Sequence, residues 1–197
     1  MAIQRTVPGL FSVRGTVILA AAFGIIVVGS AYLKVRHLRR VAEDVQWLGA
    51  DFELPRAAFS REAAESDPAC PDEENRRIFL GAMADYAHGR DAAAQRQLLR
   101  SVSAAPDWPM PRFYLGVVRL ALGFPVSAAE DLRRARELRF EPDGDSSAWW
   151  LGVAELYCGR TEAGLALLEQ AAAASSARAD EARRILDRLE HESKETE

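Results

Sequence analysis

The sequence has few of the residues that most often bind metals or carry catalysis. It contains two cysteines and three histidines in 197 residues. Cys70 and Cys158 are too few for a disulfide framework and form no metal-binding motif, and a bond between them is conceivable only in an exported domain. The histidines do not lie at metal-ligand spacing from one another or from cysteine or aspartate; they are His37, His88 and His191. The sequence therefore predicts no metal site.

Motifs of the common enzyme classes are missing as well. There is no glycine-rich loop to hold a phosphate and no G-x-S-x-G motif to present a nucleophile. The numerous carboxylates fit the solvated faces of helices. We therefore expect a protein that is not an enzyme, with no catalytic residues and no cofactor.

The first 40 residues lack acidic side chains altogether. They carry six Lys or Arg, which leaves 19 basic and 29 acidic residues in the rest of the chain, a net charge of −10. Phosphate contacts need a basic face. The acidic character of the rest of the chain therefore argues against nucleic-acid binding.

Residues 15–33 lack charge of either sign. Nineteen residues at a rise of about 1.5 Å nearly match a hydrocarbon core of about 30 Å, so we expect a transmembrane helix after an N-terminal tail, residues 1–14. The alternative is a cleaved signal peptide with small residues at 29–31, although the apolar run is longer than an ordinary signal-peptide core. Four Lys or Arg follow the run and two precede it. The apolar run predicts a single-pass membrane protein bound to the lipid bilayer through residues 15–33. The charge balance favours an orientation in which its C-terminal part faces the cytoplasm.

Residues 34–73 are interpreted as a juxtamembrane helix followed by a linker. Four apolar residues recur at intervals of three and four and form one stripe: Leu38, Val41, Val45 and Leu48. The stripe either packs on the folded domain or forms a short coiled coil that makes a homodimer, helped by the small residues Ala20 and Gly24. Prolines interrupt the linker, in which a short helix over 57–65 is expected to turn Phe59 and Ala63 inward.

The remainder of the chain repeats itself. Gly116 and Gly152 are 36 residues apart, and so are Gly123 and Gly159. A third copy lies upstream, where Gly81 precedes Gly116 by 35 residues. Self-similarity at a fixed period near 34 residues is typical of stacked helical hairpins. We therefore expect three hairpins, at about 74–105, 109–141 and 145–176.

The glycines of each copy have two distinct roles. The glycine of each Leu-Gly step carries no side chain and lets a neighbouring helix approach closely. Gly89, Gly123 and Gly159 fall where the first helix of each hairpin must end, and glycine reaches the left-handed C-cap conformation at little cost. Small residues and a leucine then recur on one face of each second helix.

This pattern of Leu-Gly step, turn glycine, small residue and leucine resembles the tetratricopeptide repeat (TPR) family over roughly residues 74–176. The resemblance implies antiparallel helix pairs that stack into a right-handed superhelix. We thus expect an all-α fold: an N-terminal transmembrane helix, a short α-solenoid of about three TPR-like repeats, and a C-terminal helix at 177–190 that caps the last apolar face. The polar tail, 191–197, is expected to be disordered.

In TPR proteins the first helices line most of the concave face, which implies a partner-binding groove here. The residues assigned to this predicted groove are Asn75, Ile78, Asp85, Tyr86, Met110, Phe113, Val117, Leu120, Trp149, Val153 and Tyr157. They are mainly apolar and aromatic, which suits an apolar or amphipathic segment of a partner protein. The alternative is that Phe113, Trp149 and Tyr157 fill the core. The basic residues with which some family members grip a C-terminal carboxylate are absent, so that specificity is not implied.

The sequence thus favours a membrane-anchored TPR scaffold or adaptor that mediates protein–protein interaction in a membrane-associated assembly. The alternative is an assembly chaperone or accessory subunit of a membrane enzyme complex that holds client proteins transiently. The groove assignment carries its own test. Phe113→Ala combined with Trp149→Ala is expected to lose the partner while the domain stays helical.

Overall fold

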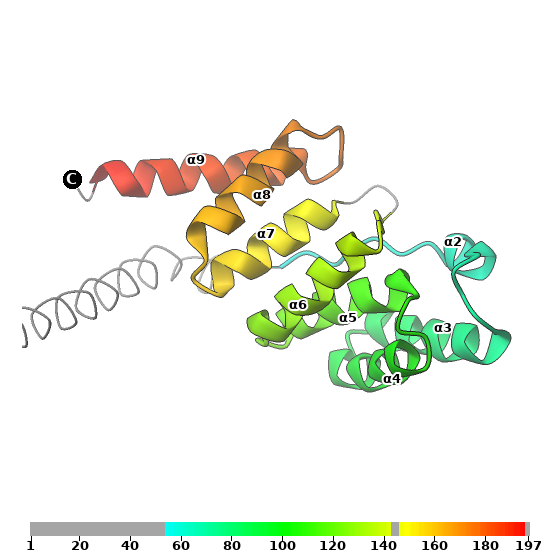
Figure 1. Ribbon diagram of the computed structural model, residues 1–197. Helices are drawn as coiled ribbons and strands as arrows, with labels where there is room; N and C mark the ends of the chain where they lie inside the picture. Colours follow the sequence, from blue (N-terminus) through cyan, green and yellow to red (C-terminus); the bar gives the residue numbers. More distant parts are fainter. Residues whose placement is uncertain (1–53, 143–145, 196–197) are drawn as a thin grey trace, which may run out of the picture. The chain divides into compact units, whose positions relative to one another are not determined.

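The computed structural model describes residues 54–142 and 146–195, and every regular element within these ranges is an α-helix. The expected all-α fold is therefore confirmed (Figure 1). The helices are α2 (Arg61–Ser66), α3 (Glu73–Ala87), α4 (Asp91–Ala104), α5 (Pro109–Ala121), α6 (Pro125–Glu137), α7 (Ser147–Tyr157), α8 (Thr161–Ala173) and α9 (Ala179–Glu195). The predicted N-terminal tail, transmembrane helix and apolar stripe at 38–48 lie outside the described residues.

The predicted localisation, a single-pass membrane protein with its repeats facing the cytoplasm, needs correction. No helix over residues 54–142 and 146–195 is long and apolar enough to cross a membrane. The longest of these helices, α9, has 17 residues and carries charged side chains along its length, whereas a spanning helix needs about 20 predominantly apolar residues. The segment on which the prediction rested, residues 15–33, lies outside the described residues.

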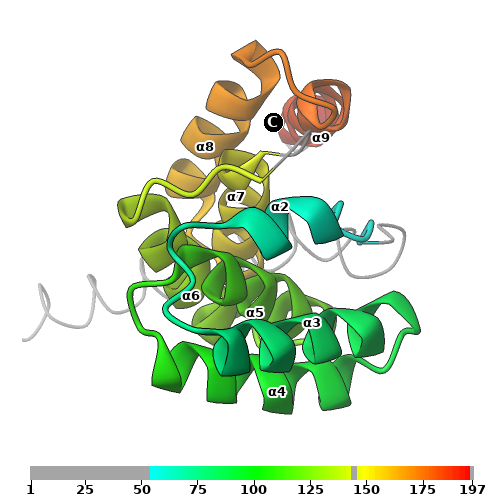
Figure 2. The ribbon, with the colours of Figure 1, turned by 90° about the vertical axis from the view of Figure 1, so that its right-hand side faces the viewer.

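Six of the helices form three successive pairs, α3–α4, α5–α6 and α7–α8, in the ranges where the repeats predict hairpins. Each helix packs mainly against its neighbours in the chain, and α9 packs against α8 (Figures 1 and 2). Contacts between adjacent elements of this kind are typical of helical repeat proteins. The packing is consistent with an α-solenoid.

The first helix of each pair ends in the same hydrogen-bonded turn. Gly89, Gly123 and Gly159 have φ angles of 71°, 79° and 71°, in the left-handed region. Each glycine N–H bonds the carbonyl three residues earlier, and the next residue bonds the carbonyl five residues earlier, at distances between 2.8 and 3.0 Å. These two bonds define the Schellman motif, which satisfies carbonyls at a helix end. The predicted role of the three glycines as C-caps is confirmed.

A fourth turn of the same kind follows α6, but it contains arginine. Arg139 has φ 60°, its N–H bonds the Arg136 carbonyl at 2.8 Å, and Phe140 bonds the Ala135 carbonyl at 3.1 Å. The left-handed region costs a residue with a Cβ about 1–2 kcal/mol. Here the sequence places an unfavourable residue where the other three turns have glycine.

Arg139→Gly is expected to raise the free energy of unfolding by about 0.5–1 kcal/mol, because relief of the left-handed strain exceeds the entropy that glycine adds to the unfolded chain. Urea denaturation followed by circular dichroism measures the change. Arg139→Ala is the matched control, since it removes the same exposed side chain but keeps the Cβ, and it should stay within about 0.5 kcal/mol of the wild type. Equal stability of the two variants would contradict this interpretation.

The glycine of the Leu-Gly step lets the helices of a pair approach closely, as predicted. A Cβ on Gly116 would lie 2.6 Å from Leu132 Cγ and 3.1 Å from the Ala128 carbonyl oxygen. A Cβ on Gly152 would lie 3.1 Å from both the Gly164 carbonyl oxygen and Leu168 Cγ. In these two hairpins, the first helix therefore packs against the small residues and leucines that recur in the second helix.

The last helix closes the apolar end of the array. On α9, Ala182 and Ile185 are buried, and Leu186 and Leu189 are partly buried against the core. This is the stripe that predicts a capping helix. The helix continues to Glu195, however, five residues beyond its predicted end at 190, so the disordered tail expected from 191 is wrong for residues 191–195.

Candidate functional site

An extended segment, residues 54–60, lies against the first helices of the repeats, and we call it the strap. Pro55 restricts its own φ and keeps Leu54 out of the helical region. Ser60 then begins α2, because its side-chain oxygen accepts a hydrogen bond from Ala63 N at 3.1 Å. The short helix expected over 57–65 thus begins only at Arg61. Ala64, and not Ala63, is its buried residue.

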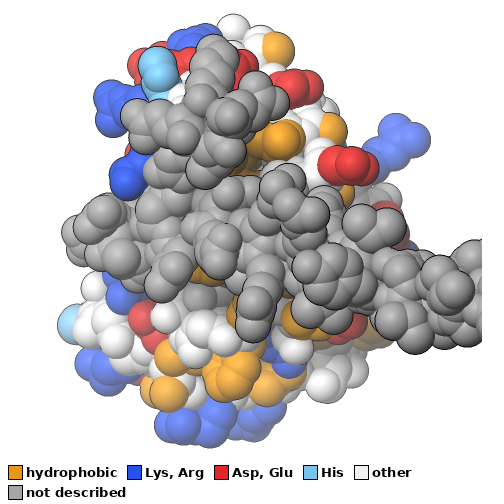
Figure 3. Space-filling model, turned by 90° about the vertical axis from the view of Figure 1, so that its left-hand side faces the viewer, with side chains coloured by type: hydrophobic (Ala, Val, Ile, Leu, Met, Phe, Trp, Pro, Cys, Tyr) orange, Lys and Arg blue, Asp and Glu red, His pale blue; other side chains and the backbone are white. Residues whose placement is uncertain are grey.

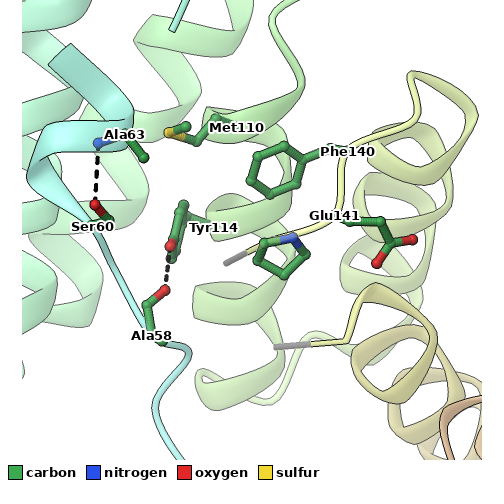
Figure 4. A pocket seen from close by; sticks show the side chains of 8 residues that line it. Ala58, Ser60, Ala63, Met110, Tyr114, Phe140 and Glu141 are labelled. Atoms are coloured by element: carbon green, nitrogen blue, oxygen red, sulfur yellow. Dashed lines mark hydrogen bonds between the residues drawn. The ribbon is translucent and has the colours of Figure 1, made fainter. Parts of the chain in front are cut away.

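The repeats bind the main chain of the strap at three successive residues. Arg178 Nη2 donates to the Arg56 carbonyl at 2.9 Å, and Ala57 N donates to Tyr86 Oη at 2.7 Å. The Tyr114 hydroxyl donates to the Ala58 carbonyl, as Figure 4 shows. These donors and acceptors come from α3, α5 and the connection before α9. Side chains far apart in the sequence therefore hold one short stretch of extended backbone.

The side chain of Arg56 contacts two further groups of the repeats. Nη1 donates to the Tyr86 carbonyl at 2.6 Å and to Asp91 Oδ1 at 3.1 Å, and Nη2 lies 3.4 Å from Asp91 Oδ2. The guanidinium carbon lies 4.6 Å from the centroid of the Tyr86 ring. A planar cation therefore meets a carboxylate, a helix-terminal carbonyl and an aromatic face at one place.

Phe59 packs edge-on against two aromatic rings. Its centroid lies 5.9 Å from that of Phe79 and 5.8 Å from that of Tyr114, at interplanar angles of 77° and 85°. Edge-to-face pairs at this separation are favourable. Together, Phe79, Tyr86, Asp91, Tyr114 and Arg178 form the surface that contacts the strap, and we call it the strap site.

The chain after the strap is also attached to the repeats. Ala64 in α2 is fully buried, and Trp108 Nε1 donates to Asp67 Oδ2 at 2.7 Å. Figure 2 shows α2 beside α3, and the contacts between these two helices agree with this view. Residues 54–67, which the sequence suggests are a linker, are thus part of the folded domain.

Two hollows border the strap. One has a volume of about 700 Å³ and is lined by the strap itself, by Tyr86 and Asp91, and by Val117, Ala121 and Trp150. The other, about 60 Å³, lies beside Tyr114, where Met110 and Phe140 line it from the repeats (Figure 4). The strap therefore does not fill the whole surface next to it.

Three of the predicted groove residues border the strap or these hollows. Tyr86 binds the strap directly, Val117 lines the larger hollow and Met110 lines the smaller one. Four others are buried in the core: Phe113, Leu120, Trp149 and Val153. Trp149 supports the strap site indirectly, because the Arg178 guanidinium stacks 5.1 Å from the centroid of its ring.

The remaining predicted groove residues have other surroundings. Asn75 lies in the first turn of α3, where its N–H and its side-chain amide both donate to the carboxylate of the N-cap residue, Asp72. Asp85 binds Arg90 and Gln97 within the first hairpin. Ile78 and Tyr157 are half-buried, and burial raises the pKa of Tyr157 above its ordinary value. The structure thus does not gather the predicted set into one surface.

Several residues of the site were not identified from the sequence. Phe79, Tyr114 and Trp150 each stand two residues before the glycine of a Leu-Gly step, so an aromatic residue recurs at one repeat position. All three are buried, and two of them, Phe79 and Tyr114, contact the Phe59 ring of the strap. The recurrence of an aromatic residue at this repeat position is the sequence pattern that could have identified these residues. Nothing in the local sequence distinguishes Asp91 or Arg178 from the many other charged residues.

The buried carboxylates belong to contacts between helices. Glu155 in α7 binds Arg133 from α6 and Arg160, and its side chain is 4% exposed. Asp131 in α6 binds Arg112 and Arg119 from α5. Burial raises the pKa of Asp131, an effect that exceeds the opposing attraction of the Arg119 charge. These ion pairs fasten neighbouring helices together.

The two cysteines are free thiols in the described structure. Burial raises the pKa of the Cys158 thiol, so little nucleophilic thiolate forms there at neutral pH. Among the described residues, no group of three or more His, Cys, Asp or Glu could hold a metal ion. The described contacts of the strap site are hydrogen bonds, an ion pair and aromatic packing, and all of them are made to the strap.

Part of the described surface is apolar. Figure 3 shows hydrophobic side chains gathered on the lower part of one face, next to Lys and Arg. Among the described residues, the large hydrophobic side chains that are exposed are Leu99, Phe124 and Val126. Phe124 and Val126 flank Pro125, the first residue of α6.

A scan against models of protein families finds no match for this chain, and a search of curated proteins finds none either. The resemblance to TPR proteins therefore rests on the residues at the repeat positions. What the strap site does has to be inferred from its own geometry.

Proposed function

We propose that this chain is a TPR-like scaffold or adaptor whose strap site binds an extended segment of another protein. One observation carries the proposal: the site already holds an extended segment, the strap, by its main chain at three successive residues. A surface that binds backbone in this way accepts an extended peptide, while pockets for side chains add specificity.

The strength of the contacts supports binding in trans. The hydrogen bond between Ala57 N and Tyr86 Oη is buried, and leaving a buried partner unpaired costs about 1–3 kcal/mol. Tyr86 and Tyr114 are nearly inaccessible to solvent. When the strap leaves, the Tyr86 and Tyr114 hydroxyls lose their hydrogen bonds to it, and a second peptide of similar chemistry would restore them.

The geometry favours a scaffold over a holder of unfolded clients. Proteins that bind many different clients use flexible surfaces that can repack. Here Phe79 and Trp108 are fully buried, and the Tyr114 ring packs against Phe79, Tyr86 and Phe113. A surface fixed by such packing suits a defined partner segment.

The test measures binding of a fluorescent peptide with the sequence of residues 54–66 to the full chain. Arg56→Ala with Phe59→Ala gives a strap-weakened chain, in which the strap leaves its site more often. We expect saturable binding to this chain and at least about tenfold weaker binding to the wild type, because apparent affinity scales with the fraction of open sites. Fluorescence anisotropy measures both, and circular dichroism confirms that the variant remains helical.

Two controls make the result specific. A peptide of the same composition in scrambled order should not bind. Tyr86→Phe with Tyr114→Phe in the strap-weakened chain should reduce the affinity about tenfold or more, because each lost hydroxyl removes about 1 kcal/mol of hydrogen bonding. Equal binding of the scrambled peptide, or no binding to a folded strap-weakened chain, would refute the proposed function.

A further inference from the structure

We infer that the strap site selects a partner segment with the pattern arginine, small residue, any residue, aromatic residue, and that Asp91 is the residue that selects the arginine. This inference rests on the proposed function and names the chemistry of the partner. The pattern is that of the strap, Arg56-Ala57-Ala58-Phe59, whose four side chains meet four different environments.

The first position requires a planar cation. The two Asp91 oxygens face the two terminal nitrogens of Arg56, and the Tyr86 ring lies beneath the guanidinium. The Tyr86 carbonyl, which also accepts this side chain, lies at the C-terminal end of α3, where the helix dipole favours positive charge. Lysine offers one point charge and no two-pronged donor, so arginine fits this site better.

The second and third positions differ in the space they have. Ala57 is 5% exposed and its N–H bonds Tyr86 Oη, so a large side chain at this position has little free space. Ala58 is exposed, and only its carbonyl is bound, by Tyr114. The site therefore demands a small residue at the second position and accepts any residue at the third.

The fourth position is aromatic. Phe59 stands edge-on to both Phe79 and Tyr114, and a tyrosine or tryptophan ring offers the same geometry. An aliphatic residue would keep the burial and lose the ring pairing. The main-chain bonds at residues 56, 57 and 58 fix the spacing between arginine and ring, because they hold the backbone extended between them.

The partner is another protein and not a second copy of this chain. In each copy the strap already occupies its own site, so an exchange of straps between two copies replaces every contact by an identical one. The short connection from α2 to α3, residues 67–72, keeps the strap near its own site at high effective concentration. A different protein wins this competition only by adding contacts, and the larger hollow beside the strap, where Arg56 and Ala121 are exposed, offers surface for them.

The experiment uses the strap-weakened full chain and a series of peptides based on residues 54–66, in which one position changes at a time. Replacement of the arginine by alanine, of the second residue by leucine, or of the aromatic residue by alanine should each weaken binding by about tenfold or more, the factor that about 1.4 kcal/mol represents. Replacement of the third residue by serine should leave the affinity within about threefold, as for a substitution worth less than about 0.7 kcal/mol.

Charge reversal tests Asp91 itself. Asp91→Arg in the strap-weakened chain should abolish binding of the arginine peptide and restore binding of a peptide with aspartate at that position. Asp107→Arg is the matched control, since Asp107 has the same charge change, is 84% exposed and pairs with Arg134 outside the strap site. The control chain should keep its preference for the arginine peptide. Circular dichroism verifies that both variants are folded.

The outcomes separate this inference from the proposed function. Peptides that bind regardless of the arginine and the ring would overturn the pattern and leave the proposed function intact. Failure of every peptide to bind a folded strap-weakened chain would overturn both. Sedimentation velocity tests the choice of partner, and we expect the wild type to be a monomer. A dimer that dissociates when Phe59 is replaced by alanine would assign the site to a second copy and overturn that choice.

Discussion

The Phe113→Ala, Trp149→Ala double variant is expected to lose its cooperative fold at 25 °C. Both side chains are completely inaccessible to solvent. The Phe113 ring packs 5.2 Å from Tyr114 and 5.3 Å from Phe140, and the Trp149 ring packs 4.8 Å from Trp150. Truncation of a buried Phe or Trp costs about 3–5 kcal/mol, so the two changes remove about 6–10 kcal/mol of a total stability of about 5–15 kcal/mol.

Urea denaturation followed by circular dichroism measures this loss. Phe124→Ala is the matched control, because Phe124 is 54% exposed and its truncation should change the stability by no more than about 0.5 kcal/mol. A double variant that unfolds cooperatively near the wild-type urea concentration would contradict the burial of these two rings. From the sequence, this variant was expected to stay helical and lose only its partner; from the burial of both rings, we now expect it to unfold. Substitutions at Tyr86 and Tyr114 are therefore the better test of binding.

Gly116→Ala is expected to lower the free energy of unfolding by about 2 kcal/mol, although alanine is the better helix former. The new Cβ would lie 2.6 Å from Leu132 Cγ and 3.1 Å from a backbone oxygen of α6. Leu132 is 1% exposed and has nowhere to move, so α5 and α6 must separate. Overpacking of this kind costs about 1–3 kcal/mol or more, which exceeds the gain of about 1 kcal/mol in helix propensity.

Gly81→Ala provides the matched comparison at the same repeat position. A Cβ there would meet Gln97 Oε1 at 2.8 Å, and that atom is the far end of a flexible side chain. Gln97 can rotate away and then loses its 2.6 Å hydrogen bond to Asp85, which offsets the gain in helix propensity. The variant should therefore stay within about 1 kcal/mol of the wild type. Chemical denaturation of the two variants side by side checks the difference. Equal destabilisation by both would mean that helix approach at Gly116 is not the limiting contact.

The repeat pattern was readable because its key positions are constrained locally. A helix that must turn sharply needs a residue that tolerates positive φ, and Gly89, Gly123 and Gly159 mark those ends at a nearly constant spacing. Arg139 occupies the same conformation without glycine, so that turn carries no such mark. The apolar stripe of α9 was equally local, and it predicted a capping helix from 177, two residues before α9 begins at Ala179.

The face of each first helix was harder to assign. The sequence-based groove contains Phe113 and Trp149, whereas the strap contacts Tyr114 and the larger hollow is bordered by Trp150. A shift of one residue rotates a side chain by about 100° around a helix. In α5 and α7 both neighbouring positions are aromatic and buried, so local hydrophobicity does not decide which one faces the concave side.

The sequence by itself determined the helices, their pairing and the glycines that end them, because these depend on residues close together in the chain. Only the tertiary structure decided where the strap lies. Its partners, Tyr86, Tyr114 and Arg178, are 29, 56 and 122 residues away from the strap residues they bind. The strap, Leu-Pro-Arg-Ala-Ala-Phe-Ser, precedes α2 and has no periodicity of its own. Its extended form and its place on the repeats follow from hydrogen bonds and ring contacts that exist only once the hairpins have stacked.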